Sequence, residues 1–273
     1  MPNSSSMNAK MYGVLLVLVL AVATCFAGCT GSQTPAGPGS ETSGANETPL
    51  YVVGVDGAYP PYASIQKDGT ITGLDVESIQ WIAEKKGFRV KIQPMDWDGI
   101  IPALNAHKID MVYSGMTITP ERLEAVNFSI PYLTINQSFA IRNNSAVTMA
   151  DIEAGKAVIG AQRGTTGAYW VEENLIATGK MPKKNLILYD NFPLAITDLV
   201  NERIDATVYD RPPHLSAIEG KPAHIIGEIY TGENYGVAIR KDDTELLTTI
   251  NEGLTELMAS PKWQELLEKY EMK

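Results

Sequence analysis

The sequence predicts an α/β fold made of two lobes, and two features of the chain carry this prediction. First, short apolar or alternating segments take turns with helical stretches from residue 50 to residue 240, which is typical of helices layered on mostly parallel sheets. Second, a unit occurs twice. Residues 108–114 and 203–210 each follow a helical stretch and enter a strand that ends in a polar residue, so we expect each lobe to contain one copy.

A second repeat indicates where the chain passes between the lobes. Residues 139–142 (FAIR) resemble residues 237–240 (VAIR), and the two tetrapeptides bracket a middle segment. We interpret them as a pair of hinge strands that cross between the lobes; the alternative is a chance likeness between strand-forming tetrapeptides. On this interpretation lobe 1 comprises residues 50–140 and 237–273, and lobe 2 comprises residues 141–236.

The first strand-helix-strand unit follows from the spacing of apolar residues. Residues 50–55 form an apolar run that ends at Asp56, and residues 88–93 alternate with a period of two, as a half-buried strand does. Between them apolar residues recur at helical spacing, and Gly87 ends that helix. Further strands are expected at residues 111–114, 157–162, 186–189, 206–209 and 236–240.

The composition is that of a globular protein that does not bind nucleic acid. The 273 residues carry 32 acidic and 22 basic side chains, a formal net charge of -10, and an acidic chain without a basic block repels phosphate backbones.

The only cysteines are Cys25 and Cys29. His107, His214 and His224 lack metal-ligand spacing, so we expect solvated or core-edge histidines, no metal and no cofactor.

The first 28 residues have the pattern of a secretory signal peptide, because a single cation, Lys10, precedes a long apolar run. Residues 26–29 (FAGC) resemble a lipoprotein cleavage site, which makes Cys29 the expected lipid anchor. The alternatives are a signal that happens to contain a cysteine and an uncleaved signal anchor. Residues 29–49 are mostly Gly, Ser, Thr, Pro and Ala, and we expect a flexible tether at the outer face of the cytoplasmic membrane.

Polar side chains stand where several predicted strands end. Ligands of open α/β sheets bind beyond the carboxyl ends of the strands, where loops and helix N-termini converge. Four candidate positions lie there: Asp56, Ser114 with Thr117, Thr165 with Thr166, and Asp210.

Two of the charged residues suggest what the ligand is. Thr119 and Pro120 begin a helix well, which puts Arg122 in the first turn, where a cation does not complement the helix dipole. A guanidinium there suits a bound carboxylate, which it holds with two hydrogen bonds. Asp210 at a strand end suits an ammonium group. Together Arg122 and Asp210 would bind the two opposite charges of a zwitterion. The alternatives are that Arg122 forms a surface ion pair and that Asp210 caps a helix.

Longer motifs in the chain resemble one family. Residues 97–104 (WDGIIPAL), 108–110 (KID) and 114–122 (SGMTITPER) have the order and spacing found in the extracytoplasmic solute-binding proteins of polar amino acid ABC transporters. The resemblance extends over residues 50 to 273. It also includes residues 56–62, 73–76 and 164–167.

The resemblance implies a two-lobed periplasmic-binding-protein fold of type II, whose lobes are joined by two crossing hinge strands. It also implies a role for each matching residue. Arg122 binds the ligand α-carboxylate together with Thr117, Thr165 and Thr166, Asp210 receives the α-ammonium, and Tyr59 and Trp97 sandwich the ligand side chain.

Four further positions bear on which ligand is bound. The resemblance places Asp56 at the distal polar group of the ligand, and family members differ at the positions of Ser114, Gly115 and Gln162. Gly115 and Gln162 depart from the pattern of histidine-binding members, and the pair Ser114-Gly115 is closer to members that bind glutamine or arginine. The ligand is therefore left open among lysine, arginine, histidine and glutamine.

The expected function is capture of a polar amino acid by hinge closure and its delivery to an ABC transporter permease, by a monomer that is not an enzyme. One alternative is a cyclohexadienyl or arogenate dehydratase on the same fold, since acid catalysis needs only one placed carboxylate, such as Asp56 or Glu172. Another is a sensor domain that reports to a partner other than a permease.

Overall fold

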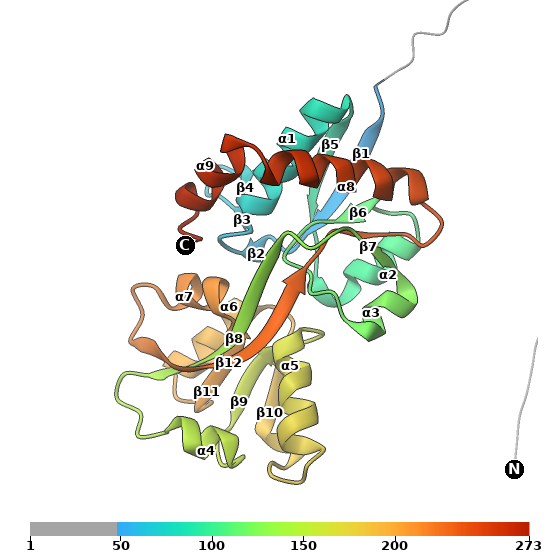
Figure 1. The fold of residues 1–273 in the computed structure, drawn as a ribbon. Coiled ribbons are helices and arrows are strands. Elements are labelled where there is room, and N and C mark those ends of the chain that lie inside the picture. The colour runs from blue at the N-terminus through green and yellow to red at the C-terminus, as the bar shows by residue number, and fades with distance from the viewer. Residues whose placement is uncertain (1–47, 273) are drawn as a thin grey trace, which may run out of the picture. The chain divides into compact units, whose positions relative to one another are not determined.

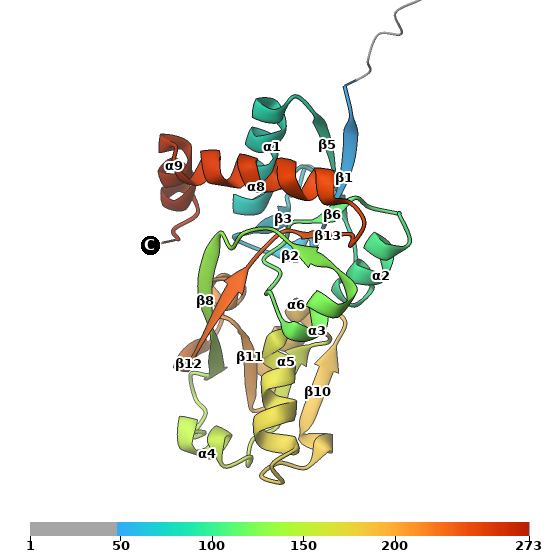
Figure 2. The same cartoon turned by 45° about the vertical axis from the view of Figure 1, so that its right-hand side comes forward.

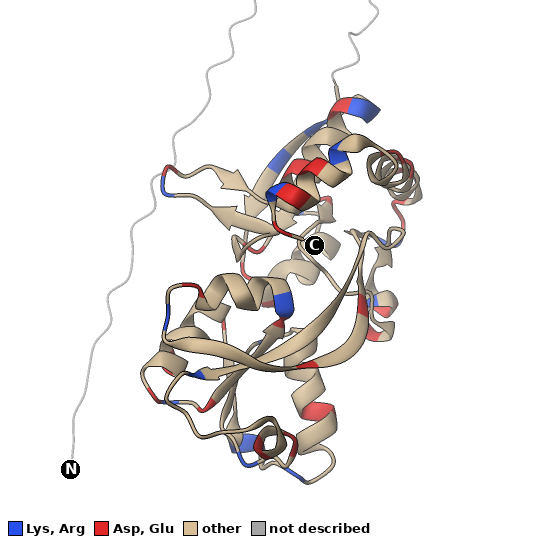
Figure 3. Ribbon diagram, turned by 60° about the vertical axis from the view of Figure 1, so that its left-hand side comes forward, with Lys and Arg blue, Asp and Glu red and all other residues tan. Residues whose placement is uncertain are grey.

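Two five-stranded sheets form the centres of two lobes in the computed structural model, which describes residues 48–272 (Figure 1). The predicted signal peptide and nearly all of the tether, including Cys29, lie outside the described residues. In the described part, no helix has the length and apolar character needed to cross a membrane. Basic and acidic side chains are interspersed along this part of the chain (Figure 3).

The lobe 1 sheet combines four strands from residues 50–128 with one strand from residues 238–239. Its strand order is β5 (Arg89–Pro94), β1 (Leu50–Val55), β6 (Met111–Val112), β13 (Ala238–Ile239) and β7 (Asn127–Phe128). Its helices are α1 (Leu74–Lys86), α2 (Ile100–Asn105), α3 (Pro120–Ala125), α8 (Thr244–Met258) and α9 (Pro261–Lys269). A small antiparallel sheet is formed by β2 (Ala58–Tyr59), β3 (Ala63–Ile65) and β4 (Ile71–Thr72), and the 3-10 turn η1 covers Trp97–Gly99.

The lobe 2 sheet repeats this plan with longer strands. Its strand order is β10 (Leu186–Tyr189), β9 (Ile159–Gln162), β11 (Ala206–Asp210), β8 (Leu133–Arg142) and β12 (Ala223–Tyr235). Its helices are α4 (Met149–Glu153), α5 (Thr166–Val171), α6 (Phe192–Val200) and α7 (Arg211–Ile218), with a π-helical turn, η2, at Glu172–Ile176 and a 3-10 turn, η3, at Lys183–Asn185.

The pairing of the strands differs from the prediction of mostly parallel sheets. In each sheet the first three strands pair in parallel, and the last two add antiparallel neighbours. The reason is the connection between the lobes. The strands that lie beside this connection run in the direction opposite to the strands of the strand-helix-strand units. The prediction holds for those units and is wrong for the strands next to the hinge.

Helix α1 shows why the first unit could be predicted. Ile79 and Ile82 are fully buried, and Gly87 ends the helix in the left-handed conformation with φ 73°, as predicted. The buried face packs on α8 at Gly253, where a Cβ would lie 2.4 Å from a methyl carbon of Ile82. Burial of each isoleucine contributes about 1.5 to 3 kcal/mol, so this face anchors α8 to α1 within lobe 1.

The predicted repeat of residues 108–114 and 203–210 is confirmed by equivalent hydrogen bonds in the two lobes. Asp110 Oδ2 accepts a hydrogen bond of 2.7 Å from the backbone N–H of Val52. Asp205 Oδ2 accepts one of 2.8 Å from Val158. In both lobes an aspartate just before a central strand thus satisfies a partly buried backbone donor near the start of the neighbouring strand.

The second repeat belongs to the same plan. Arg142 Nη1 donates to the carbonyl of Ile204 at 2.7 Å, and Arg240 Nη1 donates to the carbonyl of Ile109 at 2.7 Å. Each arginine therefore ties the end of an antiparallel strand to the residue that precedes the repeated aspartate. The likeness of the two tetrapeptides reflects equivalent places in two similar lobes.

The first crossing between the lobes lies elsewhere than the tetrapeptides suggested, whereas the return crossing agrees with the predicted boundary between residues 236 and 237. The chain leaves lobe 1 after β7 and enters the lobe 2 sheet with β8 at Leu133, whereas the sequence placed this boundary at residue 140. It returns between Tyr235, where β12 ends, and Ala238. The two passages are joined where Tyr132 N–H donates to the carbonyl of Tyr235 at 3.0 Å. Figures 1 and 2 both show β8 and β12 side by side below this point.

One histidine lies where the sequence did not place it. His214 on α7 is fully buried, and its two ring nitrogens lie 2.9 Å from the hydroxyls of Ser138 and Thr207. Burial lowers the pKa of His214 to about 3, so the ring is a neutral part of the lobe 2 core. His107 and His224 are exposed, and residues 48–272 contain no cluster of three metal-ligating side chains.

Candidate functional site

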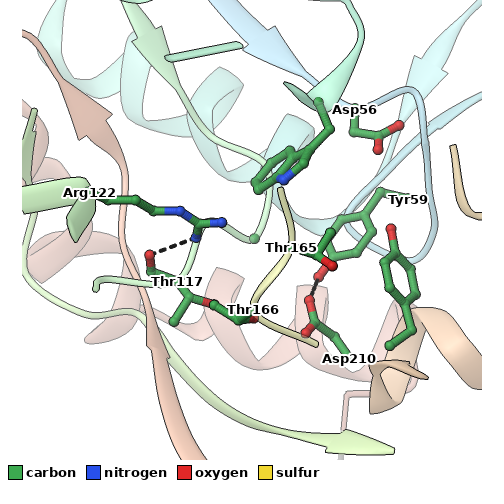
Figure 4. A pocket seen from close by; sticks show the side chains of 10 residues that line it. Asp56, Tyr59, Thr117, Arg122, Thr165, Thr166 and Asp210 are labelled. Atoms are coloured by element: carbon green, nitrogen blue, oxygen red, sulfur yellow. Dashed lines mark hydrogen bonds between the residues drawn. The ribbon is translucent and has the colours of Figure 1, made fainter. Parts of the chain in front are cut away.

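A pocket lies between the two lobes (Figure 4). Both lobes supply its walls, so it exists only where the lobes meet. Every residue predicted to bind ligand lines it, with the exceptions of Ser114 and Gln162. The lining residues are Asp56, Tyr59, Trp97, Gly115, Thr117 and Arg122 from lobe 1, and Thr165, Thr166, Tyr209 and Asp210 from lobe 2.

Arg122 is a buried cation at the lobe 1 side of the pocket. Thr119 caps α3 by accepting the backbone N–H of Arg122 at 3.2 Å. The predicted helix start therefore fixes the backbone position of Arg122. Arg122 is 8% exposed, and its guanidinium donates to the carbonyl of Thr117 at 2.9 Å and to that of Gly164 in lobe 2 at 3.0 Å. Burial lowers the pKa of Arg122.

The contacts of Arg122 exclude one of the two interpretations of its position. Among the described residues no carboxylate forms an ion pair with it, so the surface-pair alternative is wrong. Its charge is met by two neutral carbonyls and by the face of Trp97, 5.4 Å from the guanidinium carbon to the ring centre. A buried cation held in this way strongly attracts an anion.

Asp210 is the opposite charge on the lobe 2 side. It is the N-cap residue of α7, but its side chain makes no capping hydrogen bond. The carboxylate accepts hydrogen bonds from the hydroxyls of Tyr59 and Tyr235 and from Gln137 Nε2. Burial and the neighbouring Glu233 raise the pKa of Asp210 to about 6, although the three donors favour the charged form. The carboxylate is therefore positioned by neutral donors alone.

Asp56 forms the far end of the pocket from Arg122 (Figure 4). Its carboxylate accepts from the backbone N–H of Ala58 and from Gln162 Nε2, both at 2.9 Å. Ser114 lies behind it, since the Ser114 hydroxyl accepts the Asp56 backbone N–H at 3.0 Å. Burial raises the pKa of Asp56. Ser114 and Gln162 thus act on the pocket through Asp56, which explains why neither of them lines it.

Tyr209 is a pocket residue that the sequence analysis missed. Its hydroxyl donates to Gln162 Oε1 at 2.7 Å, and its ring stacks on Phe192 with centres 3.7 Å apart. The signal was its place directly before Asp210 at the carboxyl end of a strand. Together with Tyr59 and Trp97 it makes three walls of the pocket aromatic.

Comparison with known proteins places this site in a family. Residues 51–273 match the sequence model of the bacterial extracellular solute-binding proteins, family 3. The chain belongs to this family. It is a solute-binding protein of an extracellular family, and the predicted type II two-lobed fold is confirmed.

Relatives of known name are amino-acid-binding proteins. The solute-binding protein is 31% identical over 228 residues to the L-cystine-binding protein of Escherichia coli strain K12, a match covering 82% of this chain and 83% of that protein. It is 31% identical over 229 residues to the L-arginine-binding protein of Pseudomonas aeruginosa, covering 80% of this chain and 86% of that protein.

Solved structures of the same fold are also amino-acid-binding proteins. The solute-binding protein is similar to an ancestral arginine-binding protein bound to arginine, with a TM-score of 0.75, 34% identity and coverage of 81% of this chain and 97% of that one. It is also similar to an ancestral amino acid-binding protein described as a precursor of cyclohexadienyl dehydratase, with a TM-score of 0.71, 33% identity and coverage of 81% and 94%.

The three threonines of the solute-binding protein have distinct local roles. Thr117 presents its carbonyl to Arg122, and its hydroxyl donates to Glu233 at 2.8 Å. Thr165 caps α5 by accepting the Ala168 N–H at 3.3 Å. The Thr166 hydroxyl lies 3.1 Å from Gln137 Nε2. Capping and these contacts fix the loop that faces Arg122.

Gly115 shapes the pocket through its backbone. It has φ 54°, and a Cβ there would lie 2.5 Å from the ring of Tyr59, so a side chain is excluded both by strain and by space. Its N–H donates to Asp75 Oδ2 at 2.7 Å, and the Tyr132 hydroxyl donates to the same oxygen at 2.9 Å. Asp75 is fully buried and was not identified from the sequence; it ties the pocket loop to the start of the hinge.

Replacing Asp75 by asparagine should change how stability depends on pH. Burial raises the pKa of Asp75 to about 7, so folding favours the protonated form and stability falls as pH rises from the unfolded value of 3.8 through 7. The asparagine side chain does not titrate, so the stability of Asp75→Asn relative to wild type should rise by about 2 kcal/mol between pH 5 and pH 8. Urea unfolding at the two pH values measures this, and an equal difference at both would contradict it.

Proposed function

We propose that the protein captures a polar amino acid between its lobes and delivers it to an ABC transporter permease. The observation that carries the proposal is the pair of buried, opposite charges on facing lobes, Arg122 and Asp210. Among the described residues neither has an ion-pair partner. An α-carboxylate and an α-ammonium supply the two charges that this arrangement leaves to be matched.

Hinge closure follows from the cost of burying a zwitterion. Stripping water from a carboxylate and an ammonium costs several kcal/mol per ion, which is recovered only when each ion is paired and hydrogen-bonded. Because Arg122 and Asp210 lie on different lobes, both lobes must close on the ligand. The lobes are linked by the passages around Tyr132 and Tyr235, which provide the hinge.

The distal end of the pocket favours a cationic side chain. Asp56 is a buried carboxylate whose own contacts are a backbone N–H and the neutral amide of Gln162. A guanidinium, an ammonium or a protonated imidazole gains more from it than a neutral amide does. We therefore propose arginine, lysine or histidine ahead of glutamine. Relatives named for binding arginine, and the aromatic walls at Tyr59, Trp97 and Tyr209, support this order.

Replacing Asp56 by asparagine should separate cationic from neutral ligands. We expect the affinity for the preferred cationic amino acid to fall by roughly 30-fold, about 2 kcal/mol, while glutamine binding changes less than about threefold. Calorimetric titration of the refolded, ligand-stripped domain measures both. The control is Asp98→Asn, next to Trp97 in the sequence, whose exposed carboxylate lies 3.8 Å from Arg163 and should have no selective effect. Equal losses for both ligands would remove Asp56 as the selector.

The membrane anchor is part of the proposal and is supported by the sequence alone. We infer that residues 1–28 are removed and that Cys29 carries the lipid that holds the monomer at the outer face of the cytoplasmic membrane. Mass spectrometry of the mature N-terminal peptide should find acylated Cys29. Cys29→Ser should release the protein from the membrane fraction.

A dehydratase is the second candidate, because one similar structure is described as a precursor of cyclohexadienyl dehydratase. Of the two carboxylates considered from the sequence, Asp56 lines the pocket and Glu172 lies in the turn after α5, outside the lining set. We expect prephenate and arogenate to remain unchanged when incubated with the protein. Formation of the dehydrated product would replace the transport proposal by an enzymatic one.

A further inference from the structure

Glu233 is a carboxylate at the hinge that none of the predicted site residues anticipates. It lies near the end of β12, two residues before the passage at Tyr235. Its Oε2 accepts the Thr117 hydroxyl of lobe 1 at 2.8 Å, and its Oε1 accepts Gln137 Nε2 from β8 at 3.0 Å. It has no ion-pair partner within residues 48–272. Both contacts lead to pocket residues.

Gln137 connects Glu233 to the lobe 2 side of the pocket. The Gln137 side chain is fully buried, and its Nε2 also donates to Asp210 Oδ1 and lies 3.1 Å from the Thr166 hydroxyl. An amide nitrogen carries two hydrogens and no acceptor, so it suits a place between two carboxylates. The two hinge strands, β8 and β12, thus each send one side chain to the same end of the pocket.

We propose that Glu233 is a positioning residue of the ligand site, which places a second negative charge behind Asp210 and holds Gln137 and Thr117 from the hinge. This inference rests on the proposed function, because it assigns Asp210 to the ligand ammonium. Glu233 acts through its neighbours, and it does not itself line the pocket.

The charge of Glu233 has two opposite effects on an ammonium ligand. It adds to the attraction for the cation while Asp210 is ionised, since unlike charges in a buried site interact strongly. It also makes Asp210 easier to protonate, because like charges disfavour the ionised form. The remaining charged or titratable groups that face Asp210 are Arg122 of α3, Tyr59 of β2, Tyr62, Tyr209 of β11 and Tyr235 of β12.

Replacing Glu233 by glutamine removes the charge and keeps the shape. The amide oxygen can still accept from Gln137, and the amide nitrogen can still bond the Thr117 hydroxyl. The dissociation constant of the preferred amino acid is measured by calorimetry from pH 4.5 to pH 8.5. We expect binding about five- to tenfold weaker at pH 8, together with an acid limb that moves to lower pH by about half a unit.

The pattern distinguishes a charge effect from a packing defect. A purely structural loss would weaken binding by one factor at every pH and leave the acid limb in place, and that result would overturn the proposal. Glu233→Asp keeps the charge on a shorter side chain, so we expect it to lose affinity and retain the wild-type acid limb. A displaced acid limb in Glu233→Asp would also overturn the proposal.

Glu228→Gln is the matched control on the same strand. Glu228 pairs with Arg211 at the surface and lies outside the pocket, so its profile should follow wild type. If Glu228→Gln shifts the acid limb as Glu233→Gln does, the effect belongs to overall charge and the proposal fails. Wild-type protein that binds no amino acid would refute the proposed function itself, which keeps the two failures distinct.

Discussion

Replacing Arg122 by alanine is expected to weaken amino-acid binding by about 3 to 5 kcal/mol, which is more than a hundredfold in Kd. Arg122 is 8% exposed, and its guanidinium donates hydrogen bonds to two carbonyls. In the variant, Asp210 keeps the ligand ammonium as its partner while the α-carboxylate is buried without a cation. An unpaired buried charge costs more than the loss of the pair as a whole.

The measurement is calorimetric titration at pH 8 with the preferred amino acid, beside a melting curve that checks folding. Arg163→Ala is the matched control, because Arg163 precedes Gly164 and its half-exposed side chain lies 3.8 Å from Asp98 and 3.7 Å from Asp190. Such surface pairs contribute little, so we expect a change in Kd below about threefold. Affinity near that of wild type in Arg122→Ala would remove Arg122 from the site.

The parts of the fold that were predicted are those set by local patterns. Strands β1 and β10 begin and end where the apolar runs do, and α1 ends at Gly87. Strand β12 was not predicted, although it is the longest strand described. Its pairing with β8 shifts register twice, between Ile225 and Gly227 and between Ile229 and Glu233, so its side chains follow no single alternation that periodicity could detect.

The site residues divide in the same way. Some can be predicted from local sequence patterns, and others have a role only because the fold brings them together. Arg122 lies in the first turn of a helix and Asp210 lies at the end of a strand, so local sequence patterns were enough to place both residues. Asp75 lies 40 residues from Gly115, and Glu233 lies 116 residues from Thr117. Neither is marked by local spacing, because their roles consist of hydrogen bonds to residues distant in the sequence, within lobe 1 for Asp75 and between the lobes for Glu233. Sequence reasoning therefore found most of the residues that line the pocket but missed Tyr209. Of the residues that hold them it found Ser114 and Gln162 but not Asp75 or Glu233.

Replacing Asp210 by asparagine is expected to weaken binding at pH 8 by about 3 kcal/mol, roughly a hundredfold in Kd. The amide oxygen can still accept from Tyr59 and Tyr235, so two of the three hydrogen bonds that position the side chain are kept, and only the one from Gln137 is lost. The ligand ammonium, however, loses the only carboxylate among the residues lining that end of the pocket. Calorimetry measures the loss, and affinity within about threefold of wild type would exclude Asp210 as the ammonium partner.

The same substitution should make the ligand-free protein more stable at pH 8, which separates this prediction from simple misfolding. The pKa of Asp210 is raised to about 6, so its protonated form is favoured by folding and the stability it contributes declines as pH rises from 3.8 through 6. Above pH 6 the wild type carries the cost of a buried charge that asparagine lacks. We expect Asp210→Asn to gain about 1 kcal/mol over wild type between pH 5 and pH 8. Weaker binding with higher stability is what a residue kept charged for its ligand must show; lower stability at both pH values would attribute the loss of binding to damaged packing.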